Sequence, residues 1–278
     1  MEWNIITDSS CDRLRVETTA DNVEYACVPF VLQVDGRDFV DDETLDTGEM
    51  MDAMEQCGHS SHSACPAPGA WLEQYRRAEK SIAVTISSGV SGSYVSAVAA
   101  RDMALEEDPA RKIFVVDSLS AGPALAMIVR KIEAMIGEKL PFDEIACRAQ
   151  KYARELRTVF ALSSFDNLAK SGRISKLSGF VAGKLGIRAI GIASPEGRIV
   201  LKQKTRGAGK LLSLLRKDMK ERGYRGGKLI ISHCKNLELA ERLRCAVLEH
   251  WPAAQIAIMP TRGLCSYYAE RGGLIAAY

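Results

Sequence analysis

Residues 82–97 read I-A-V-T-I-S-S-G-V-S-G-S-Y-V-S-A, and the fold can be worked out from this stretch. Its beginning, residues 82–86, is a short apolar run with several β-branched side chains, which predicts a buried strand. Its end runs into residues 94–104, whose composition is helical. A tight turn of serine and glycine joins the two. The sequence therefore predicts a strand, a turn and a helix in direct succession.

The Ser/Gly turn between this strand and this helix is suited to an anion. The first four N–H groups of a helix lack intrahelical partners, and the positive end of the helix dipole adds to their field. Gly89 and Gly92 let the backbone come close to a ligand. A plainer interpretation is that Ser91 or Ser93 only caps the helix, because serine is common at helix starts. Both interpretations are open on these residues alone.

The same succession recurs further along the chain, with a strand at residues 112–116, a serine-rich turn and a helix at residues 123–136. Strands that alternate with helices indicate a largely parallel sheet, whose ligands gather at the carboxyl ends of the strands. Other strands are expected at residues 3–7, 25–34, 37–40, 158–164, 188–193, 198–204, 228–232, 255–259 and 272–278. Other helices are expected at residues 48–57, with Thr47 as the cap, and at residues 69–80, 142–156, 210–222 and 237–250.

These elements predict an α/β fold with two α/β domains and largely parallel sheets. One alternating series ends near residue 156 and another begins there, which indicates an N-terminal domain at residues 1–156 and a C-terminal domain at residues 157–278. A chain of 278 residues is long enough for two such cores. Asp35-Gly36 predicts a hairpin turn within the first domain, and residues 194–197 predict another within the second.

Composition and charge argue against several classes of protein. The 37 basic and 35 acidic residues give a net charge of +2, which is no reason to expect a nucleic-acid partner. The eight cysteines show no C-x-x-C pair and no zinc-finger spacing, as is typical of a reduced protein. The first residues do not form a signal peptide, and no apolar run approaches the ~20 residues that cross a bilayer. We expect a soluble, cytoplasmic protein.

A cluster of His and Cys residues resembles a metal site only superficially. Cys57, His59, His62 and Cys65 all lie within nine residues. Zinc ligands usually come from spaced elements, and this packing is not a recognised spacing. Solvated or packed side chains are the favoured interpretation, so no metal is expected.

Motifs for hydrolysis or nucleotide binding are incomplete. Ser91 lies between glycines, but the G-x-S-x-G frame of a nucleophile elbow is missing. His233, at the end of an expected strand, fits a general base or a satisfied histidine at the core edge equally well. No Walker A loop occurs, and no G-x-G-x-x-G follows a strand. We therefore predict no catalytic residue and no cofactor.

Lys170, Arg173, Lys176 and Lys184 form a basic cluster around Gly172. A solvated face is the simpler interpretation of such a cluster. A docking surface or a phosphate contact is the alternative.

Several motifs together resemble the DegV family. They are I-T-D-S-S-C-D at residues 6–12, I-S-S-G-V-S-G-S-Y at residues 86–94, Asp117-Ser118, L-A-K-S-G-R-I-S at residues 168–175, Arg206-Gly207 and Ile231-Ser232-His233. These motifs occur in the order of the family, and the resemblance runs over nearly the whole chain.

The resemblance implies two α/β domains with a long-chain fatty acid bound between them. Members of the family include the fatty-acid-carrying subunits of bacterial fatty acid kinase. The carboxylate would lie at the Ser/Gly turn, and the acyl chain would thread an apolar tunnel. An ATP-dependent kinase partner would phosphorylate the carboxylate, while the carrier itself would have no ATP site and no catalytic role.

The resemblance also assigns residues to the carboxylate. Ser63, in S-A-C-P-A, corresponds to the threonine of the family's T-S-Q-P-S, and Ser91 matches the second contact, with Ser88 and Gly92 beside it. Arg206 matches an arginine near the head group. A partner contact would involve Lys170, Arg173 and Lys176 of the basic cluster.

The chain departs from the family pattern at two places. The S-A-C-P-A loop has lost the family's glutamine and two of its hydroxyl positions. The C-terminal H-x-G-P-G segment reads Y-A-E-R-G-G at residues 268–273, so the histidine contact is absent or replaced by Tyr267 or Tyr268. Two other hypotheses follow from these changes. One is a different acyl or small-acid ligand without a kinase partner, and the other is a free-standing hydrolase that uses His233 or Ser91.

Overall fold

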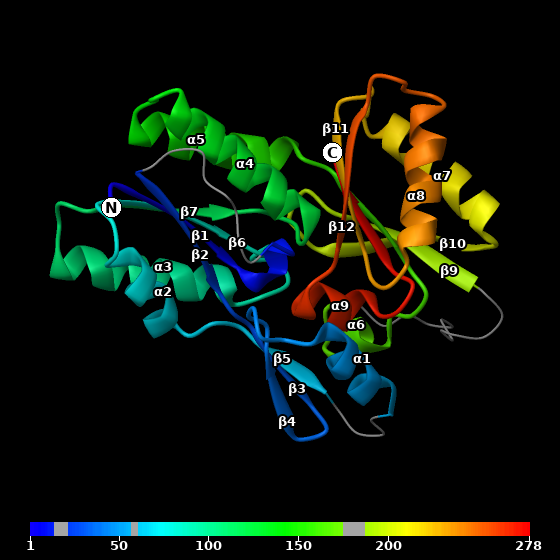
Figure 1. The fold of residues 1–278 in the computed structure, drawn as a ribbon, viewed down its shortest axis with the longest axis horizontal. Helices are drawn as coiled ribbons and strands as arrows, with labels where there is room; N and C mark the ends of the chain where they lie inside the picture. Colours follow the sequence, from blue (N-terminus) through cyan, green and yellow to red (C-terminus); the bar gives the residue numbers. More distant parts are fainter. Residues whose placement is uncertain (14–21, 57–60, 175–186) are drawn as a thin grey trace.

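The structure, a computed structural model, describes residues 1–13, 22–56, 61–174 and 187–278. A four-stranded sheet forms its N-terminal part, in the order β2-β1-β6-β7, and every pairing in it is parallel. The strands are β1 Trp3–Asp8, β2 Val23–Val28, β6 Lys80–Thr85 and β7 Lys112–Asp117. Helices α2 Pro68–Tyr75 and α3 Ser93–Glu107 lie on one side of it, and α4 Pro123–Gly137 and α5 Phe142–Glu155 lie on the other (Figure 1).

Both faces of this sheet are buried, and β1 is buried along its whole length. Ile5 packs into a core cluster with α4 and α5, whereas Ile6 packs into another with Trp71 and Tyr75 of α2. Successive strand residues point to opposite faces, so an apolar run without alternation can fill both cores. The expectation of a parallel sheet covered by helices is confirmed here.

A second sheet of six strands holds the C-terminal part, in the order β10-β9-β8-β13-β11-β12. Its strands are β8 Thr158–Leu162, β9 Ile187–Ala193, β10 Ile199–Arg206, β11 Lys228–His233, β12 Gln255–Pro260 and β13 Leu274–Ala277. Only β11 and β12 are parallel in this sheet; the other four pairings are antiparallel. The prediction of largely parallel sheets therefore holds for the first sheet and not for the second.

Two connections make the second sheet mostly antiparallel. A turn at residues 194–197 folds β9 and β10 into the expected hairpin, and the last strand, β13, inserts between β8 and β11 antiparallel to both. Helices α7 Ala208–Glu221 and α8 Leu237–Leu248 pack on one face of this sheet, and α4 contacts β11 and β13. Because α4 also packs on the first sheet, it is the layer that the two sheets share.

A small third sheet, β4-β3-β5, lies at the edge of the molecule beside α1 Thr47–Gln56 (Figure 1). It consists of β3 Val31–Val34, β4 Arg37–Val40 and β5 His62–Ala64. The apolar run at residues 25–34 divides at Pro29, which has no N–H to continue a ladder. Its first half pairs in the first sheet as β2, and its second half forms the predicted hairpin at Asp35-Gly36.

Several helix ends differ from the prediction by a few residues, and three short helices were not predicted. Asp46, not Thr47, caps α1, because its carboxylate accepts the N–H groups of Gly48 and Glu49. Helix α2 ends at Tyr75, five residues before the expected end. The short helices are η1 Ser9–Cys11, α6 Asp166–Lys170 and α9 Gly263–Ala269, which have too few turns to show a period.

Candidate functional site

Asp8 organises the edge of the first sheet where its strands end. Its carboxylate is fully buried and accepts hydrogen bonds from the Ser10 N–H and hydroxyl, the Ile86 N–H at 2.9 Å and the Ser93 hydroxyl at 2.7 Å. Burial raises the pKa of this carboxyl, and the four hydrogen bonds oppose that rise. Asp8 thus joins the end of β1 to the end of β6 and the start of α3.

The serines of the Ser/Gly turn form different hydrogen bonds. The hydroxyl of Ser93 is used by Asp8, whereas Ser91 is half-buried and its hydroxyl accepts the Ser93 N–H at 3.3 Å. Gly92 is the N-cap residue of α3, so no side chain caps this helix in the usual position. Ser91 therefore assists the first turn of α3 and also faces a cavity.

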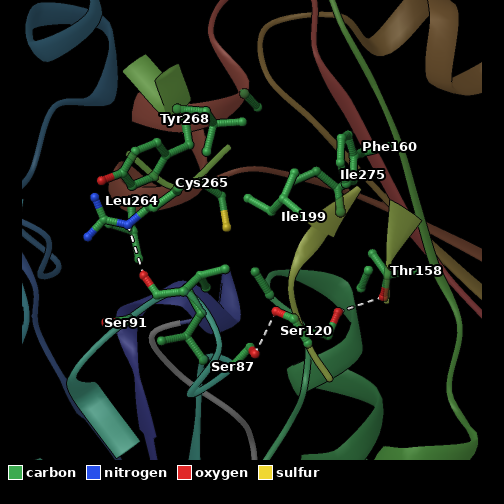
Figure 2. A pocket seen from close by; sticks show the side chains of 18 of the residues that line it. Ser87, Ser91, Ser120, Thr158, Phe160, Ile199, Leu264, Cys265, Tyr268 and Ile275 are labelled. Carbon is green, nitrogen blue, oxygen red and sulfur yellow. Dashed lines mark hydrogen bonds between the residues drawn. The ribbon is translucent and has the colours of Figure 1, made fainter. Parts of the chain in front are cut away.

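This cavity lies between the two larger sheets, and apolar side chains make most of its wall. Figure 2 shows Ser91 and Tyr268 toward one end of it and Thr158 and Phe160 toward the other. The lining residues belong to the turns after β6 and β7, to strands β8 and β13, to the β9–β10 hairpin, to helices α6 and α9, and to the segments around Phe30, Ser63 and Arg173. The site draws on parts of the chain both before and after residue 156.

Polar groups gather at one end of the cavity. The hydroxyls of Ser63 and Tyr268 share a hydrogen bond of 2.8 Å across 205 residues of sequence. The guanidinium of Arg173 lies 5.2 Å from the ring centroid of Tyr268 and donates from Nε to the Val90 carbonyl at 2.9 Å. With Ser91, this end offers three hydroxyls and one cation, a set that suits a carboxylate.

The opposite end of the cavity is closed by buried side chains. Ser120 and Thr158 share a hydrogen bond of 2.6 Å, so neither hydroxyl is left without a partner. Phe160 lies over Gly191, where an added Cβ would come within 2.3 Å of the ring. The Ser87 hydroxyl donates to the Gly197 carbonyl at 2.8 Å, which joins the turn after β6 to the β9–β10 hairpin.

The structure brings some predicted site residues together and leaves others apart. Ser63 and Ser91 both line the cavity, as does Tyr268, one of the two tyrosines proposed to replace the family's histidine. Tyr267 instead donates to the Ser61 hydroxyl at 2.7 Å. Arg173, predicted as a partner contact, lines the polar end of the cavity.

Ser88, Gly92 and Arg206 are exposed and are not among the lining residues that the structure describes. Ser88 directs its hydroxyl to Asp117, and Arg206 is the last residue of the edge strand β10. Lys170 is exposed at the end of α6, and Lys176 and Lys184 lie outside the described residues.

His233 and Ser91, the two candidates for a hydrolase, do not lie together at this cavity. His233 is half-buried at the end of β11, where its Nδ1 accepts the Asn236 N–H at 3.2 Å, and burial lowers its pKa. It is not among the described lining residues, whereas Ser91 is.

The Cys/His loop is described only in part. Cys57 and His59 lie outside the described residues, and His62 and Cys65 are exposed. Within residues 1–13, 22–56, 61–174 and 187–278, no group of three His, Cys, Asp or Glu side chains could hold a metal ion. A search of the same residues finds no helix both long enough and apolar enough to span a bilayer.

Two features of the site were missed by reasoning from sequence. One is the role of Asp8, whose signal was its place directly after a buried strand. The other is helix α9, which supplies Leu264, Cys265 and Tyr268 to the cavity wall. The only signal for α9 was the run G-L-C-S-Y-Y-A, which is too short to show a helical period.

The fold and the site define a class: an α/β protein with two large sheets and, between them, a mostly apolar cavity that has hydroxyls and a cation gathered at one end. The family model described as the DegV family of uncharacterised proteins matches residues 2–277, and the chain belongs to this family. A DegV domain-containing protein of Streptococcus pneumoniae is 40% identical over 278 residues, which are 100% of this chain and 99% of that protein.

Two solved structures are similar over nearly their whole length. The fatty acid kinase B3 protein of Streptococcus pneumoniae, loaded with linoleic acid, is 40% identical with a TM-score of 0.96, covering 100% of this chain and 99% of that one. A DegV family protein of Eubacterium eligens, loaded with heptadecanoic acid, is 37% identical with a TM-score of 0.94, covering 99% and 98%.

Proposed function

We propose that this protein binds a long-chain fatty acid in the cavity between its sheets. The observation that carries the proposal is the wall of the cavity, which is mostly apolar and gathers three hydroxyls and a guanidinium at the end formed by Ser63, Ser91, Arg173 and Tyr268. Elsewhere in the wall the hydroxyls of Ser120 and Thr158 bond to each other, and Arg198 is a second lining cation. An amphiphile with one carboxylate matches that distribution. The fatty acids in the two related structures support the same ligand class.

The acyl chain and the carboxylate of such a ligand contribute differently to its binding free energy. Burial of an acyl chain contributes ~0.8 kcal/mol per CH2, so the chain supplies most of the affinity. An unpaired carboxylate in an apolar site is costly, and hydroxyls and a guanidinium offset that cost through charge-assisted hydrogen bonds. The head group therefore fixes the orientation of the ligand in the cavity.

We also propose that the cavity marks the boundary between two domains, at residues 1–156 and 157–278. Ser63 and Ser91 come from the first part, and Arg173 and Tyr268 come from the second. Residue 156 follows α5 and precedes β8, the first strand of the second sheet.

We further propose that the protein is a carrier that presents the carboxylate to an ATP-dependent kinase partner and does not itself catalyse a reaction. The similarity to the fatty acid kinase B3 protein supports a kinase partner. The positions of Arg173 and Lys170 support it as well. Arg173 lies at the polar end of the cavity, and the exposed Lys170 is three residues away along the chain. A partner that docks at Lys170 would meet the head group directly.

Mass spectrometry of the purified protein tests the ligand. In native spectra we expect a mass excess, and after denaturation we expect its release as a long-chain fatty acid. A clean mass together with no uptake of added fatty acid would refute the proposed ligand while leaving the fold in place.

A further inference from the structure

Helix α9 begins on two buried carboxylates that come from distant parts of the chain. The N–H of Arg262, its N-cap residue, donates to Asp12 Oδ1 at 2.8 Å. The next two N–H groups, of Gly263 and Leu264, donate to the two oxygens of Asp41 at 2.8 and 2.7 Å. Three successive donors of the first turn are thus satisfied by acidic side chains more than 220 residues away in sequence.

These carboxylates fasten α9 to both sheets of the N-terminal part. Asp12 directly follows η1 at the end of β1, and Asp41 directly follows β4 of the third sheet. Asp41 is fully buried, and only 6% of Asp12 is exposed. A helix cap is usually supplied by a neighbouring residue, so this arrangement makes the place of α9 depend on tertiary contacts.

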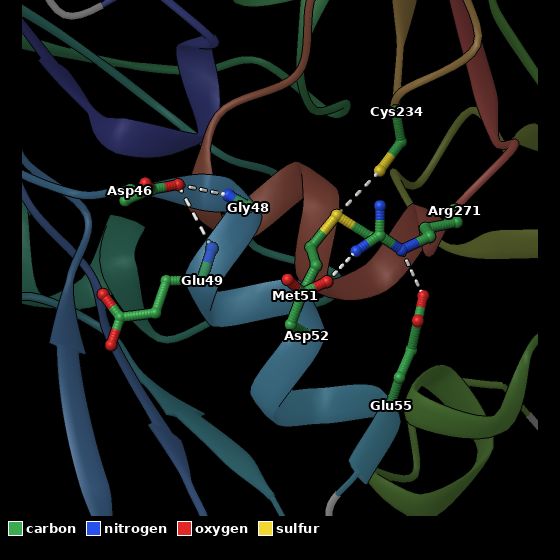
Figure 3. Close-up of polar contacts among 8 residues, drawn as sticks. All are labelled: Asp46, Gly48, Glu49, Met51, Asp52, Glu55, Cys234 and Arg271. Carbon is green, nitrogen blue, oxygen red and sulfur yellow. Dashed lines mark hydrogen bonds and ion pairs between the residues drawn. The ribbon is translucent and has the colours of Figure 1, made fainter.

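The far end of α9 is also held, but by exposed groups. Arg271 forms ion pairs with Asp52 and Glu55 of α1 (Figure 3). Exposed pairs of this kind contribute little to stability. The buried carboxylates at the start of α9 are therefore the stronger constraint on the helix.

Between these two ends, α9 carries residues of the cavity wall. Leu264, Cys265 and Tyr268 all line the cavity, and the Tyr268 hydroxyl meets Ser63 at the polar end. A small rotation or shift of α9 would break this hydrogen bond, because O–H···O bonds span only about 2.5–3.0 Å and weaken steeply when the angle at the hydrogen falls below about 120°.

We propose that Asp12 and Asp41 are positioning residues for the carboxylate of the ligand, since they fix α9 and through it the Tyr268 hydroxyl beside Ser63. This inference rests on the proposed function, because it assigns Tyr268 to the head group of a bound fatty acid.

The surroundings of Asp12 make this constraint sensitive to pH. Burial raises the pKa of Asp12 to about 7, and the nearby Asp41 carboxylate adds to the rise. The titratable groups around it include Asp8 and Cys11 from the β1 side, Cys265 from α9, and Cys234, which directly follows β11. Gly122, the N-cap residue of α4, lies beside Asp12, where an added Cβ would come within 3.0 Å of Oδ2. The Arg262 guanidinium donates to the Asp42 carbonyl.

An ionised carboxylate is a stronger acceptor than a protonated one, so the Arg262 N–H is held most firmly above pH 7. Head-group binding is therefore expected to weaken as the pH falls from 8 to 6. An ordinary carboxyl group of a ligand stays ionised over this range, since its pKa lies near 4.

The test compares ligands with and without a carboxylate. Dissociation of oleic acid and of oleyl alcohol would be measured between pH 6 and 8 for the wild-type protein, Asp12→Asn, Tyr268→Phe and the double variant. Asp12→Asn keeps the shape of the side chain and the acceptor at Oδ1 but removes the charge. Asp108→Asn is a matched control, because its carboxylate also accepts a backbone N–H, from Ala110, but at an exposed site on the far end of α3.

For the wild type we expect oleic acid to dissociate roughly three- to tenfold faster at pH 6 than at pH 8, and oleyl alcohol at an unchanged rate. Asp12→Asn should show the faster rate at every pH, and Asp108→Asn should behave as the wild type. In the Tyr268→Phe background, Asp12→Asn should have no further effect, which is the sign of coupling in a double-mutant cycle.

Other results would overturn the inference. Equal losses for the acid and the alcohol, or an undiminished effect of Asp12→Asn without the Tyr268 hydroxyl, would mean that Asp12 only stabilises the fold. Tighter binding of the acid at pH 6 would mean direct repulsion between Asp12 and the ligand. If a variant fails to fold, the pH profile of the wild type still tests the inference. Absence of any binding by the wild type would refute the proposed function instead.

Discussion

At the scale of single residues, neighbouring hydroxyls make different contacts. Ser88 and Ser91 are three positions apart in one turn, yet Ser88 is exposed and bonded to Asp117, while Ser91 faces the cavity. The backbone path of the turn, and not the residue type, separates them. Such a pair provides a variant and its own control.

Ser91→Ala should weaken fatty-acid binding by ~1.5–3 kcal/mol, because it removes a donor to a buried anion. Titration of the delipidated protein with a fluorescent fatty acid measures this change. Ser88→Ala should leave the affinity as it is. Unchanged affinity in Ser91→Ala would remove Ser91 from the head-group site.

At the scale of elements, two turns interlock across the molecule. The turn after β6 and the β9–β10 hairpin approach so closely that a Cβ on Gly197 would lie 2.0 Å from the Ser87 hydroxyl oxygen. A Cβ on Gly89 would lie 2.7 Å from the Glu196 carbonyl oxygen. Glycine is required at these two positions by close approach, and the contact closes one side of the cavity.

Gly197→Ala should therefore lower the free energy of unfolding more than Gly36→Ala. Both glycines have a positive φ, of +70° and +73°, so both substitutions carry backbone strain of ~1–2 kcal/mol. Gly36 has no atom within 4 Å of the added Cβ, whereas Gly197 adds an overpacking cost of ~1–3 kcal/mol. Urea unfolding of the two variants measures the difference, and equal losses would show that the hairpin moves aside freely.

At the scale of the whole molecule, three buried carboxylates gather where the sheets and α9 meet. Burial is the largest cause of a raised pKa at Asp8, Asp12 and Asp41. A carboxyl with a raised pKa binds its proton more tightly in the folded chain than in the unfolded one. Its contribution to stability is present at low pH and is lost as the pH rises toward the folded-state pKa.

For Asp12 this loss falls between about pH 4 and pH 7, the ordinary and the raised pKa of the group. Asp12→Asn should remove roughly 2–4 kcal/mol of the difference in stability between pH 4.5 and pH 8. Urea unfolding of the wild type and the variant at both pH values measures it. His233 changes stability in the opposite direction, but it is present in both proteins and cancels in the comparison. Identical pH dependence in the two proteins would show that Asp12 does not titrate in this range.

Much of the fold could be predicted from the sequence because its signals are local. The strand at residues 82–86, the Ser/Gly turn and the helix after it follow from apolar pattern and turn chemistry within a few residues. The hairpin at Asp35-Gly36 follows from two residues with positive φ. The mixed second sheet could not be predicted in this way, since strand order depends on where β13 inserts.

The candidate site shows the same division. By itself the sequence determined most of the longer helices and strands, the serine-rich turns at strand ends, the DegV resemblance and the candidates Ser63 and Ser91. Tertiary structure alone decided that Tyr268 meets Ser63 across 205 residues, that Arg173 reaches the polar end, and that Asp12 and Asp41 hold α9. The physical reason is the distance along the chain over which each kind of interaction acts. Periodicity and turn preferences act over a few neighbouring residues, whereas these contacts form only after the sheets have packed around α4 and brought distant segments together.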